Sequence, residues 1–485
     1  MPKVRRLSSF NRAGLFTLCA AVVGLTSFAA GLWNAQYLSA QTFLAKKALV
    51  ERNTDLQAKW APVVEKCSRA IKTNPRNPQP YMDRSNAYLG LERYEEAFDD
   101  ANKAVSLASN LAEAYCCRAY AAGHLRKYED EIADCNKAIS LDPKLAEAYL
   151  WRGIANQHLE KPKLVVENCT AALKLDPTLV RAYCRRAGAL DDLGEKEAAL
   201  KDCNRAVQID PRFTESYYYR AWIYGEQKNF RKQLADCNLA ISLEPAEEYL
   251  YRARGQAFEN IGQMDNAIAD CNTSIELCRD RNYGTAYAFR GSVQCRQGNY
   301  IDALKDCDEA TKIDPRCSNA LYVRGIAHRL LYQNKESIDD FSEVLKLTPE
   351  DPDAYGQRAL SHQFAGEFIQ ELADCNKALK LDPNRKWVYW HRGFGERKLH
   401  QFELAIKDFD RALADDSKDA WAYAYRGRSN GELGSYRRER EDCETALRLD
   451  PTNPPGCEGC IHAWLGMHCP ALLRPFHAWL NLFGF

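Results

Sequence analysis

The cysteines of this 485-residue chain recur with a fixed period. Nine of them are separated by 34 residues or a multiple of 34, except for one interval that is two residues longer: Cys67, Cys135, Cys169, Cys203, Cys237, Cys271, Cys307, Cys375 and Cys443. Ala101, Phe341 and Phe409 stand at the remaining places and complete a series of twelve. A period of this length indicates that one small structural unit is repeated along the chain.

An arginine precedes eleven of these twelve places by 17 residues. We call these residues the ladder arginines: Arg84, Arg118, Arg152, Arg186, Arg220, Arg254, Arg290, Arg324, Arg358, Arg392 and Arg426. Each is followed by Ser, Ala or Gly, and ten of them are preceded by a tyrosine at a distance of three residues. A small residue at a constant place on a helix allows a second helix to approach closely.

The second half of each unit has the pattern of an amphipathic helix. In one copy, Ile132, Cys135, Ala138 and Ile139 fall on the same helical face, and Pro143 follows the helix. Proline cannot continue a helix and disfavours helical geometry in the residue before it, so the helix must end there. Each unit is therefore predicted to be a helix, a short turn and a second helix.

This pattern resembles the tetratricopeptide repeat (TPR) family, which has the same period, a small residue in the first helix, an alanine late in the second and a terminal proline. The resemblance covers roughly residues 60 to 455. It departs from the family where arginine replaces the usual leucine and cysteine replaces the usual aromatic residue. It implies an all-α fold, a right-handed α-solenoid of TPR helix-turn-helix repeats, forming one extended domain.

The expected organisation starts with a membrane anchor, because charge is absent from Ala13 to Ala45 and basic residues precede this stretch. The predicted segments are a basic cytoplasmic segment at 1–12, a transmembrane signal-anchor at 13–38, a linker or helix at 39–59, a TPR array of about eleven repeats plus a leading half repeat at 60–453, and an apolar capping tail at 454–485. This arrangement predicts a single-pass membrane protein with its repeats on the non-cytoplasmic side. Cleavage of a signal peptide near Ala29, followed by export, is the alternative.

The repeated cysteines and arginines are interpreted as structural. One cysteine per unit on equivalent helical faces cannot form disulfides with its neighbours, so these thiols are expected to be small core residues. An aspartate follows ten ladder arginines by 16 residues, which predicts an ion pair within each unit instead of a track for an anionic ligand. The 66 basic and 66 acidic residues balance, so the chain has no global field that favours nucleic acid.

Partner binding is predicted on the first helices, which line the concave surface of TPR proteins. The resemblance places exposed positions two residues on either side of a ladder arginine and five residues before it. Eight residues there are predicted to bind partners: Tyr218, Trp222, Tyr322, Trp387, Trp390, Phe394, Trp421 and Arg428. Packing of the same rings against adjacent helices is the alternative.

A separate cationic cluster, Arg181 and Arg185, is a candidate anion-binding site for an acidic peptide. The chaperone-tail clamp found in some TPR proteins needs an asparagine before the arginine of an earlier unit. Cys117 and Trp151 stand there in this chain, so that clamp is not expected.

The tail offers the only candidate chemistry. Cys457, Cys460, His468 and Cys469 include a Cys-x2-Cys pair and are ligand types of structural zinc sites, but their spacing is a weak signal and no metal is assigned. The chain has no phosphate loop and no nucleophile elbow. We therefore expect a non-enzyme without cofactor or small-molecule substrate.

The predicted function is a non-catalytic, membrane-tethered scaffold that binds peptide or protein segments on its concave face. Two alternatives stay open. One is an assembly or secretion factor for envelope proteins, and the other is a spacer for a zinc-binding or membrane-associated C-terminal tail.

Overall fold

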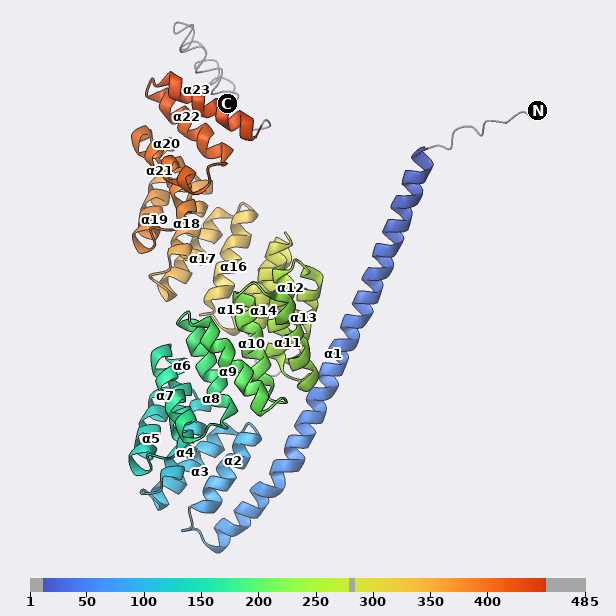
Figure 1. Ribbon diagram of the computed structural model, residues 1–485, viewed down its shortest axis with the longest axis vertical. Coiled ribbons are helices and arrows are strands. Elements are labelled where there is room, and N and C mark those ends of the chain that lie inside the picture. The colour runs from blue at the N-terminus through green and yellow to red at the C-terminus, as the bar shows by residue number, and fades with distance from the viewer. Residues whose placement is uncertain (1–11, 279–283, 451–485) are drawn as a thin grey trace, which may run out of the picture. The chain divides into compact units, whose positions relative to one another are not determined.

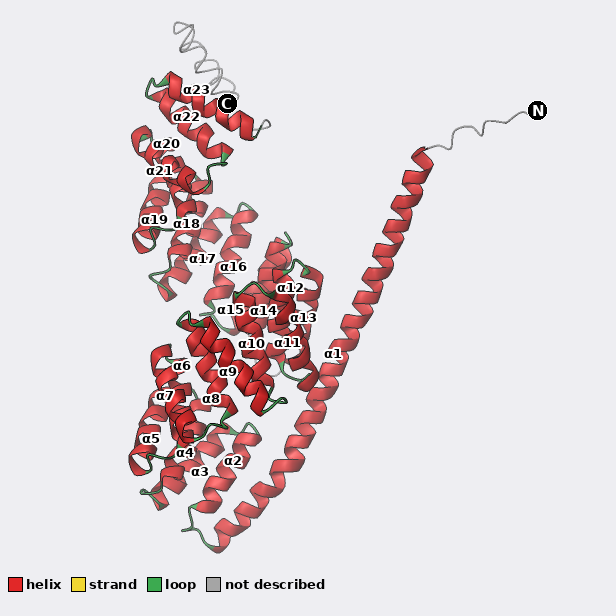
Figure 2. Cartoon of the chain, viewed as in Figure 1, coloured by secondary structure: helices red, strands yellow, loops and turns green. Residues whose placement is uncertain are grey.

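The computed structural model describes the backbone of residues 12–278 and 284–450, and side chains from residue 41 onward apart from residue 415 (Figure 1). Every element in these ranges is an α-helix (Figure 2). The chain divides into two compact units, Met1–Asn282 and Tyr283–Phe485, where the sequence had suggested one continuous domain. The division falls within the longer interval between Cys271 and Cys307. A solenoid permits such a division, because each repeat packs mainly against its neighbours.

Unit 1 consists of one long helix followed by six helix pairs (Figure 1). Its helices are α1 (Arg12–Thr73), α2 (Gln79–Gly90), α3 (Tyr94–Leu107), α4 (Ala112–His124), α5 (Tyr128–Leu141), α6 (Ala146–His158), α7 (Pro162–Leu175), α8 (Val180–Asp192), α9 (Lys196–Ile209), α10 (Thr214–Glu226), α11 (Phe230–Leu243), α12 (Glu248–Asn260) and α13 (Met264–Leu277).

Unit 2 consists of five further pairs in the part of the chain up to residue 450. Its helices are α14 (Gly284–Arg296), α15 (Tyr300–Ile313), α16 (Ser318–Leu330), α17 (Asn334–Leu347), α18 (Pro352–Ala365), α19 (Phe368–Leu381), α20 (Lys386–Lys398), α21 (Phe402–Asp415), α22 (Ala420–Glu432) and α23 (Tyr436–Leu449).

The turn inside each pair has one recurring conformation. The residue eight places after the ladder arginine has a positive φ in all eleven pairs. Five of these residues are glycines, such as Gly434 (φ 75°), and six are not, among them Lys228 (φ 57°) and Tyr332 (φ 59°). The left-handed conformation strains residues that carry a Cβ, so these six turns are held by the packing of the two helices.

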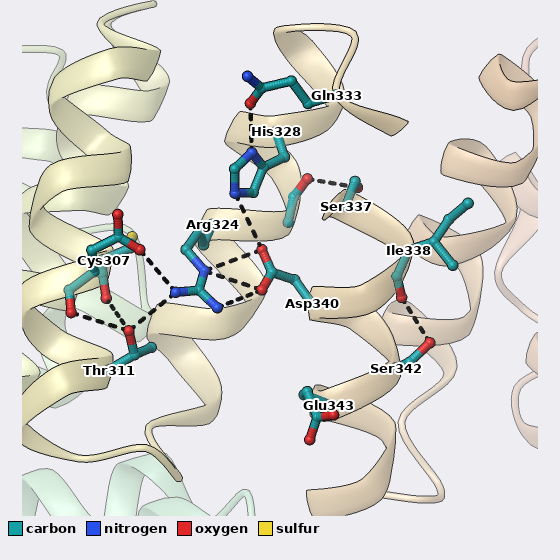
Figure 3. A network of polar contacts seen from close by, with 12 residues as sticks. Cys307, Thr311, Arg324, His328, Gln333, Ser337, Ile338, Asp340, Ser342 and Glu343 are labelled. Atoms are coloured by element: carbon teal, nitrogen blue, oxygen red, sulfur yellow. Dashed lines mark hydrogen bonds and ion pairs between the residues drawn. The ribbon is translucent and has the colours of Figure 1, made fainter. Parts of the chain in front are cut away.

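The ladder arginines tie the helix pairs together. Arg324 on α16 donates from Nη2 to Asp340 on α17 at 2.7 Å and from Nη1 to Asp308 on the preceding α15 at 2.8 Å (Figure 3). The same arrangement recurs along both units, with Asn168 in place of the aspartate opposite Arg152. These hydrogen bonds confirm the predicted pairing. Ten of the ladder arginines also donate a hydrogen bond to the preceding repeat or to α1, which the sequence analysis had not anticipated.

The repeated cysteines lie in the core. All nine are at most 6% exposed, and every cysteine whose side chain the structure describes is a free thiol. Burial raises the pKa of seven of these thiols, for example that of Cys169 to about 12, which disfavours the reactive thiolate. The prediction that they act as small core residues is confirmed.

Helix α1 contacts both ends of unit 1. Its last turns form the leading half repeat, where Ser68 accepts a hydrogen bond from Arg84 at 3.0 Å. Nearer its start, α1 packs on α13, where Thr42 and Thr273 are hydrogen-bonded at 2.7 Å and Ala45 is completely buried. The segment predicted as a linker or helix at 39–59 is helical, and its part around Thr42 and Ala45 packs on α13.

The backbone of residues 13–38 belongs to α1. Within the described residues, no helix combines the length and the apolar character that crossing a bilayer requires. The transmembrane anchor at 13–38 stays a prediction.

Candidate partner-binding pockets

One pocket lies in unit 2 and is walled by aromatic rings. We call it the aromatic pocket; it has a volume of about 610 Å³. It is formed by α20, α21, α22 and the loop between the last two. Its lining residues are Lys386, Trp387, Trp390, His391, Ala412, Asp416, Asp419, Trp421 and Tyr425.

The rings of the aromatic pocket hold one another in place. Trp390 meets Tyr425 edge to face at 5.8 Å between centroids, and Trp421 stacks on Tyr425 at 6.0 Å. Trp387 lies over Gly356 of α18, where a Cβ would come within 2.5 Å of its ring. Trp421 is nevertheless 42% exposed. The pocket therefore presents a pre-formed apolar wall with one accessible indole.

The polar groups of the aromatic pocket are oriented by the backbone and by a neighbouring side chain. Asp419 Oδ1 accepts a hydrogen bond from the Ala422 amide at 3.0 Å and caps α22. Asp416 Oδ1 accepts from the Lys418 amide at 2.9 Å. His391 Nδ1 is hydrogen-bonded to Gln363 at 2.9 Å, and burial lowers the pKa of this imidazole to about 4. At neutral pH the histidine is uncharged.

A second pocket, of about 310 Å³, lies in unit 1 among the first helices α4, α6, α8 and α10, with Glu131 of α5 also in its lining. We call it the cationic pocket. It is lined by Tyr120, Gly123, His124, Glu131, Trp151, Ile154, His158, Arg181, Arg185 and Glu215. Tyr120 and Trp151 stack at 4.0 Å between centroids and form one of its walls.

The charges of the cationic pocket are partly satisfied internally. Glu215 lies 3.0 Å from Arg185 and 4.0 Å from Arg181, and Arg185 also donates to the Tyr219 hydroxyl at 2.7 Å. Glu131 is 1% exposed, and burial raises the pKa of its carboxyl to about 8. The predicted anion-binding pair therefore faces a pocket, but a carboxylate of the chain already occupies part of its hydrogen-bonding capacity. Anion binding stays a prediction.

The structure brings together three of the eight residues predicted to bind partners, Trp387, Trp390 and Trp421. Phe394 stacks on Trp390 at 5.9 Å behind the pocket, and Arg428 is not among its lining residues.

The other three predicted residues lie elsewhere. Tyr218 is half-buried and meets Tyr249 edge to face, Trp222 is 52% exposed and donates to Asp191 at 3.1 Å, and Tyr322 packs against Phe341 at 5.5 Å. Tyr218 and Tyr322 thus pack against rings of neighbouring helices, which is the alternative to partner binding that the sequence had left open.

Sequence reasoning missed the place directly before a ladder arginine. Tyr425 and His391 in unit 2, and Trp151 in unit 1, stand there and line a pocket. Arg185 stands at the same place and was predicted only as part of the cationic cluster. The signal was available, because this place is held by large side chains in several repeats. The place two residues after the arginine lines the cationic pocket through Tyr120 and Ile154, but Trp222, which stands at the same place, lines neither pocket.

The weakly indicated metal ligands Cys457, Cys460, His468 and Cys469 lie outside the described residues, as does the tail 454–485. Among the residues that the structure does describe, no cluster of three or more histidine, cysteine or acidic side chains is placed to hold a metal ion.

Comparison with known families matches three Tetratricopeptide repeat models to this chain. They cover residues 180–213, residues 395–454, and residues 78–111, 112–145 and 250–281. The matched stretches lie in both units.

Two curated relatives match short stretches. A "Protein SGT1 homolog" from Oryza sativa subsp. japonica is 37% identical over 15% of this chain and 18% of its own length. "Tetratricopeptide repeat protein 36" from Caenorhabditis elegans is 39% identical over 11% of this chain and 30% of its own length. The chain therefore spans less than a third of either relative.

Among solved structures, a chain of the APC/C hetero-tetramer Cut9–Hcn1 aligns over 88% of this chain and 98% of its own, with 14% identity and a TM-score of 0.48. A tetratricopeptide repeat protein from Parabacteroides merdae aligns over 53% and 99%, with 17% identity and a TM-score of 0.39. The family models and the observed helix pairs together identify the described part of this chain as an all-α tetratricopeptide-repeat solenoid.

Proposed function

We propose that this protein is a non-catalytic scaffold that binds peptide or protein segments, with the aromatic pocket of unit 2 as its main binding site. The observation that carries the proposal is the pocket itself. Three tryptophans and a tyrosine converge on about 610 Å³ of accessible space. Pockets of this size that are walled by aromatic rings are typical of ligand sites, and tryptophan and tyrosine dominate binding energy at protein interfaces.

The solenoid supports the same proposal. Stacked helix pairs present successive first helices along one surface, which suits an extended partner segment that touches several repeats. The aromatic pocket takes residues from two consecutive first helices, α20 and α22. A segment that lies across both would place one side chain in the pocket and its backbone along the neighbouring helices.

Crosslinking and affinity capture with the full-length protein and the Trp421→Ala variant test the proposal. Trp421 is preferable to Trp390, because Trp390 also packs against the completely buried Phe409 and its loss would disturb the core. Ile369→Ala is the matched control, since Ile369 is 73% exposed and lines neither pocket.

We expect a defined set of partners to disappear with Trp421→Ala and to remain with Ile369→Ala. A purified partner from that set should then bind the wild type and show weaker binding to the Trp421→Ala variant in titration. Equal capture by all three proteins would show that the aromatic pocket is not the binding site. The predicted membrane tether and the side of the membrane are not part of this proposal.

A further inference from the structure

We propose that the aromatic pocket binds the side chain of an arginine or lysine in the partner segment. This inference rests on the proposed function and names the chemistry that the pocket recognises. Its basis is the combination of indole rings and carboxylates at one place. Lysine ammonium and arginine guanidinium groups bind over the faces of aromatic rings, and most strongly over tryptophan.

The aromatic wall suits a flat cation. Trp421 and Tyr425 are inclined by 27°, and Trp390 stands at 83° to Tyr425, so the rings form two walls of a corner. A guanidinium can stack on one wall while its edge points to hydrogen-bond acceptors. The chain already uses this kind of contact, since Arg426 lies 5.2 Å from the centre of the Tyr423 ring.

The charges of the lining complement a cation. Asp416 and Asp419 contribute two carboxylates to the lining. His391 is uncharged at neutral pH, because burial lowers its pKa to about 4. Lys386 is the single charged base in the lining. Two carboxylates and one lysine leave one negative charge in excess among the lining residues, beside the rings of Trp390 and Trp421. The ring of Tyr425 already has the Arg397 guanidinium 5.6 Å from its centre.

The cationic pocket of unit 1 has the opposite charge character. It contains two arginines of its own, Arg181 and Arg185, against Glu215. A basic side chain would be repelled there. A basic segment should therefore distinguish the two pockets.

The probe is an array of ten-residue peptides. Each peptide carries arginine, lysine, citrulline, leucine or glutamate at one central position within the same set of randomised flanks. The full-length wild type and the Trp421→Ala variant are incubated with it. We expect the signal that Trp421→Ala loses to be concentrated in the arginine and lysine peptides. Citrulline is the matched control, since it has nearly the shape of arginine without its charge.

The best arginine peptide is then titrated. Replacing its arginine by citrulline should weaken binding roughly tenfold, the loss expected for a desolvated cation on an aromatic ring beside a carboxylate. The double variant Asp416→Asn, Asp419→Asn should weaken the arginine peptide and leave the citrulline peptide unchanged. Asparagine keeps the Oδ1 acceptor that both loop turns use, so the fold of the loop is preserved. Lys386→Gln should strengthen the arginine peptide.

Selection of leucine or glutamate peptides, or a citrulline peptide that binds within twofold of the arginine peptide, would overturn the inference and leave the proposed scaffold function intact. If no peptide on the array depends on Trp421, the inference also fails. In that case the capture experiment decides the proposed function independently, because it uses native partners and assumes nothing about their charge.

Discussion

The two pockets share two places of the repeat, where one pocket has arginines and the other has aromatic rings. The places five residues and one residue before a ladder arginine hold Arg181 and Arg185 in unit 1, and Trp421 and Tyr425 in unit 2. The repeat thus fixes where a side chain points, and the identity of that side chain alone decides what the pocket can bind. Two binding surfaces with different preferences can arise on one scaffold in this way, without any change of fold.

The units also differ in how their polar groups are covered. In unit 1, Gln41 of α1 accepts a hydrogen bond from Arg254 at 2.9 Å, and the ion pair of Arg254 with Asp270 is the most buried of the ladder, with side chains 6% and 1% exposed. In unit 2, the pair of Arg426 with Asp442 is 22% and 10% exposed. The ladder ion pair is therefore less accessible to water in the repeat that α1 covers than in the repeat of unit 2 that contains Arg426.

The largest effect is expected from the covered ion pair. Arg254→Ala leaves the Asp270 carboxylate buried without its cation, which should cost about 3–5 kcal/mol of unfolding free energy. Arg426→Ala should cost less, because water can reach Asp442. Thermal and urea denaturation of the two variants measure the difference. Equal losses would show that the cover by α1 does not change the energetics of the ladder.

Buried carboxyls should make stability depend on pH. Glu131 in unit 1 and Glu371 in unit 2 stand at equivalent places, and burial raises the pKa of each to about 8. The unfolded value is about 4.3, so between about pH 5 and pH 8 the folded chain holds protons that the unfolded chain has lost. The unfolding free energy should therefore fall as pH rises through this window, by up to roughly 1.4 kcal/mol per pH unit for each carboxyl.

Glu131→Gln cannot ionise and should reduce that pH dependence, as should Glu371→Gln. Melting temperatures at pH 5, 7 and 9 measure it. Hydrogen exchange at the same pH values assigns each change to its unit. A variant whose pH dependence equals that of the wild type would contradict the role of that carboxyl.

The tryptophans of the two pockets should contribute different amounts to the unfolding free energy. Trp151 is half-buried and stacked on Tyr120, so Trp151→Ala should lower the unfolding free energy by about 2–3 kcal/mol. Trp421→Ala removes a more exposed ring and should cost less than about 1 kcal/mol. Chemical denaturation compares them. A large loss for Trp421→Ala would mean that this ring serves the fold instead of a partner.

The smallest effect tests a feature that the two units share. Lys228 in unit 1 and Tyr332 in unit 2 both have positive φ in the turn of their pair, and both are exposed. Replacing either by glycine relieves the strain of a Cβ and should stabilise its unit by up to about 1 kcal/mol. Similar gains are expected in both units. A gain in only one would show that the turns are not equivalent.

Much of the fold could be predicted, because the repeat encodes it locally. The pairing of Arg220 with Asp236 spans only 16 residues within one helix pair, so the period alone places the two side chains opposite each other. The pockets could be predicted only in part. Trp387 and Trp421 were identified from their place before a ladder arginine. Asp419 was not, because it lies in a loop whose direction the helical pattern does not describe.

The sequence by itself determined the repeat, the two helices of each repeat, the buried cysteines and the ion pairs of the ladder arginines. All of these depend on contacts within one helix pair, where the sequence separation of two residues fixes their relative position. Only the tertiary structure decided which first helices converge on a pocket and where α1 lies. The hydrogen bond between Gln41 and Arg254 spans 213 residues. Such a contact depends on how successive repeats rotate against one another, and the packing of side chains between helices sets that rotation.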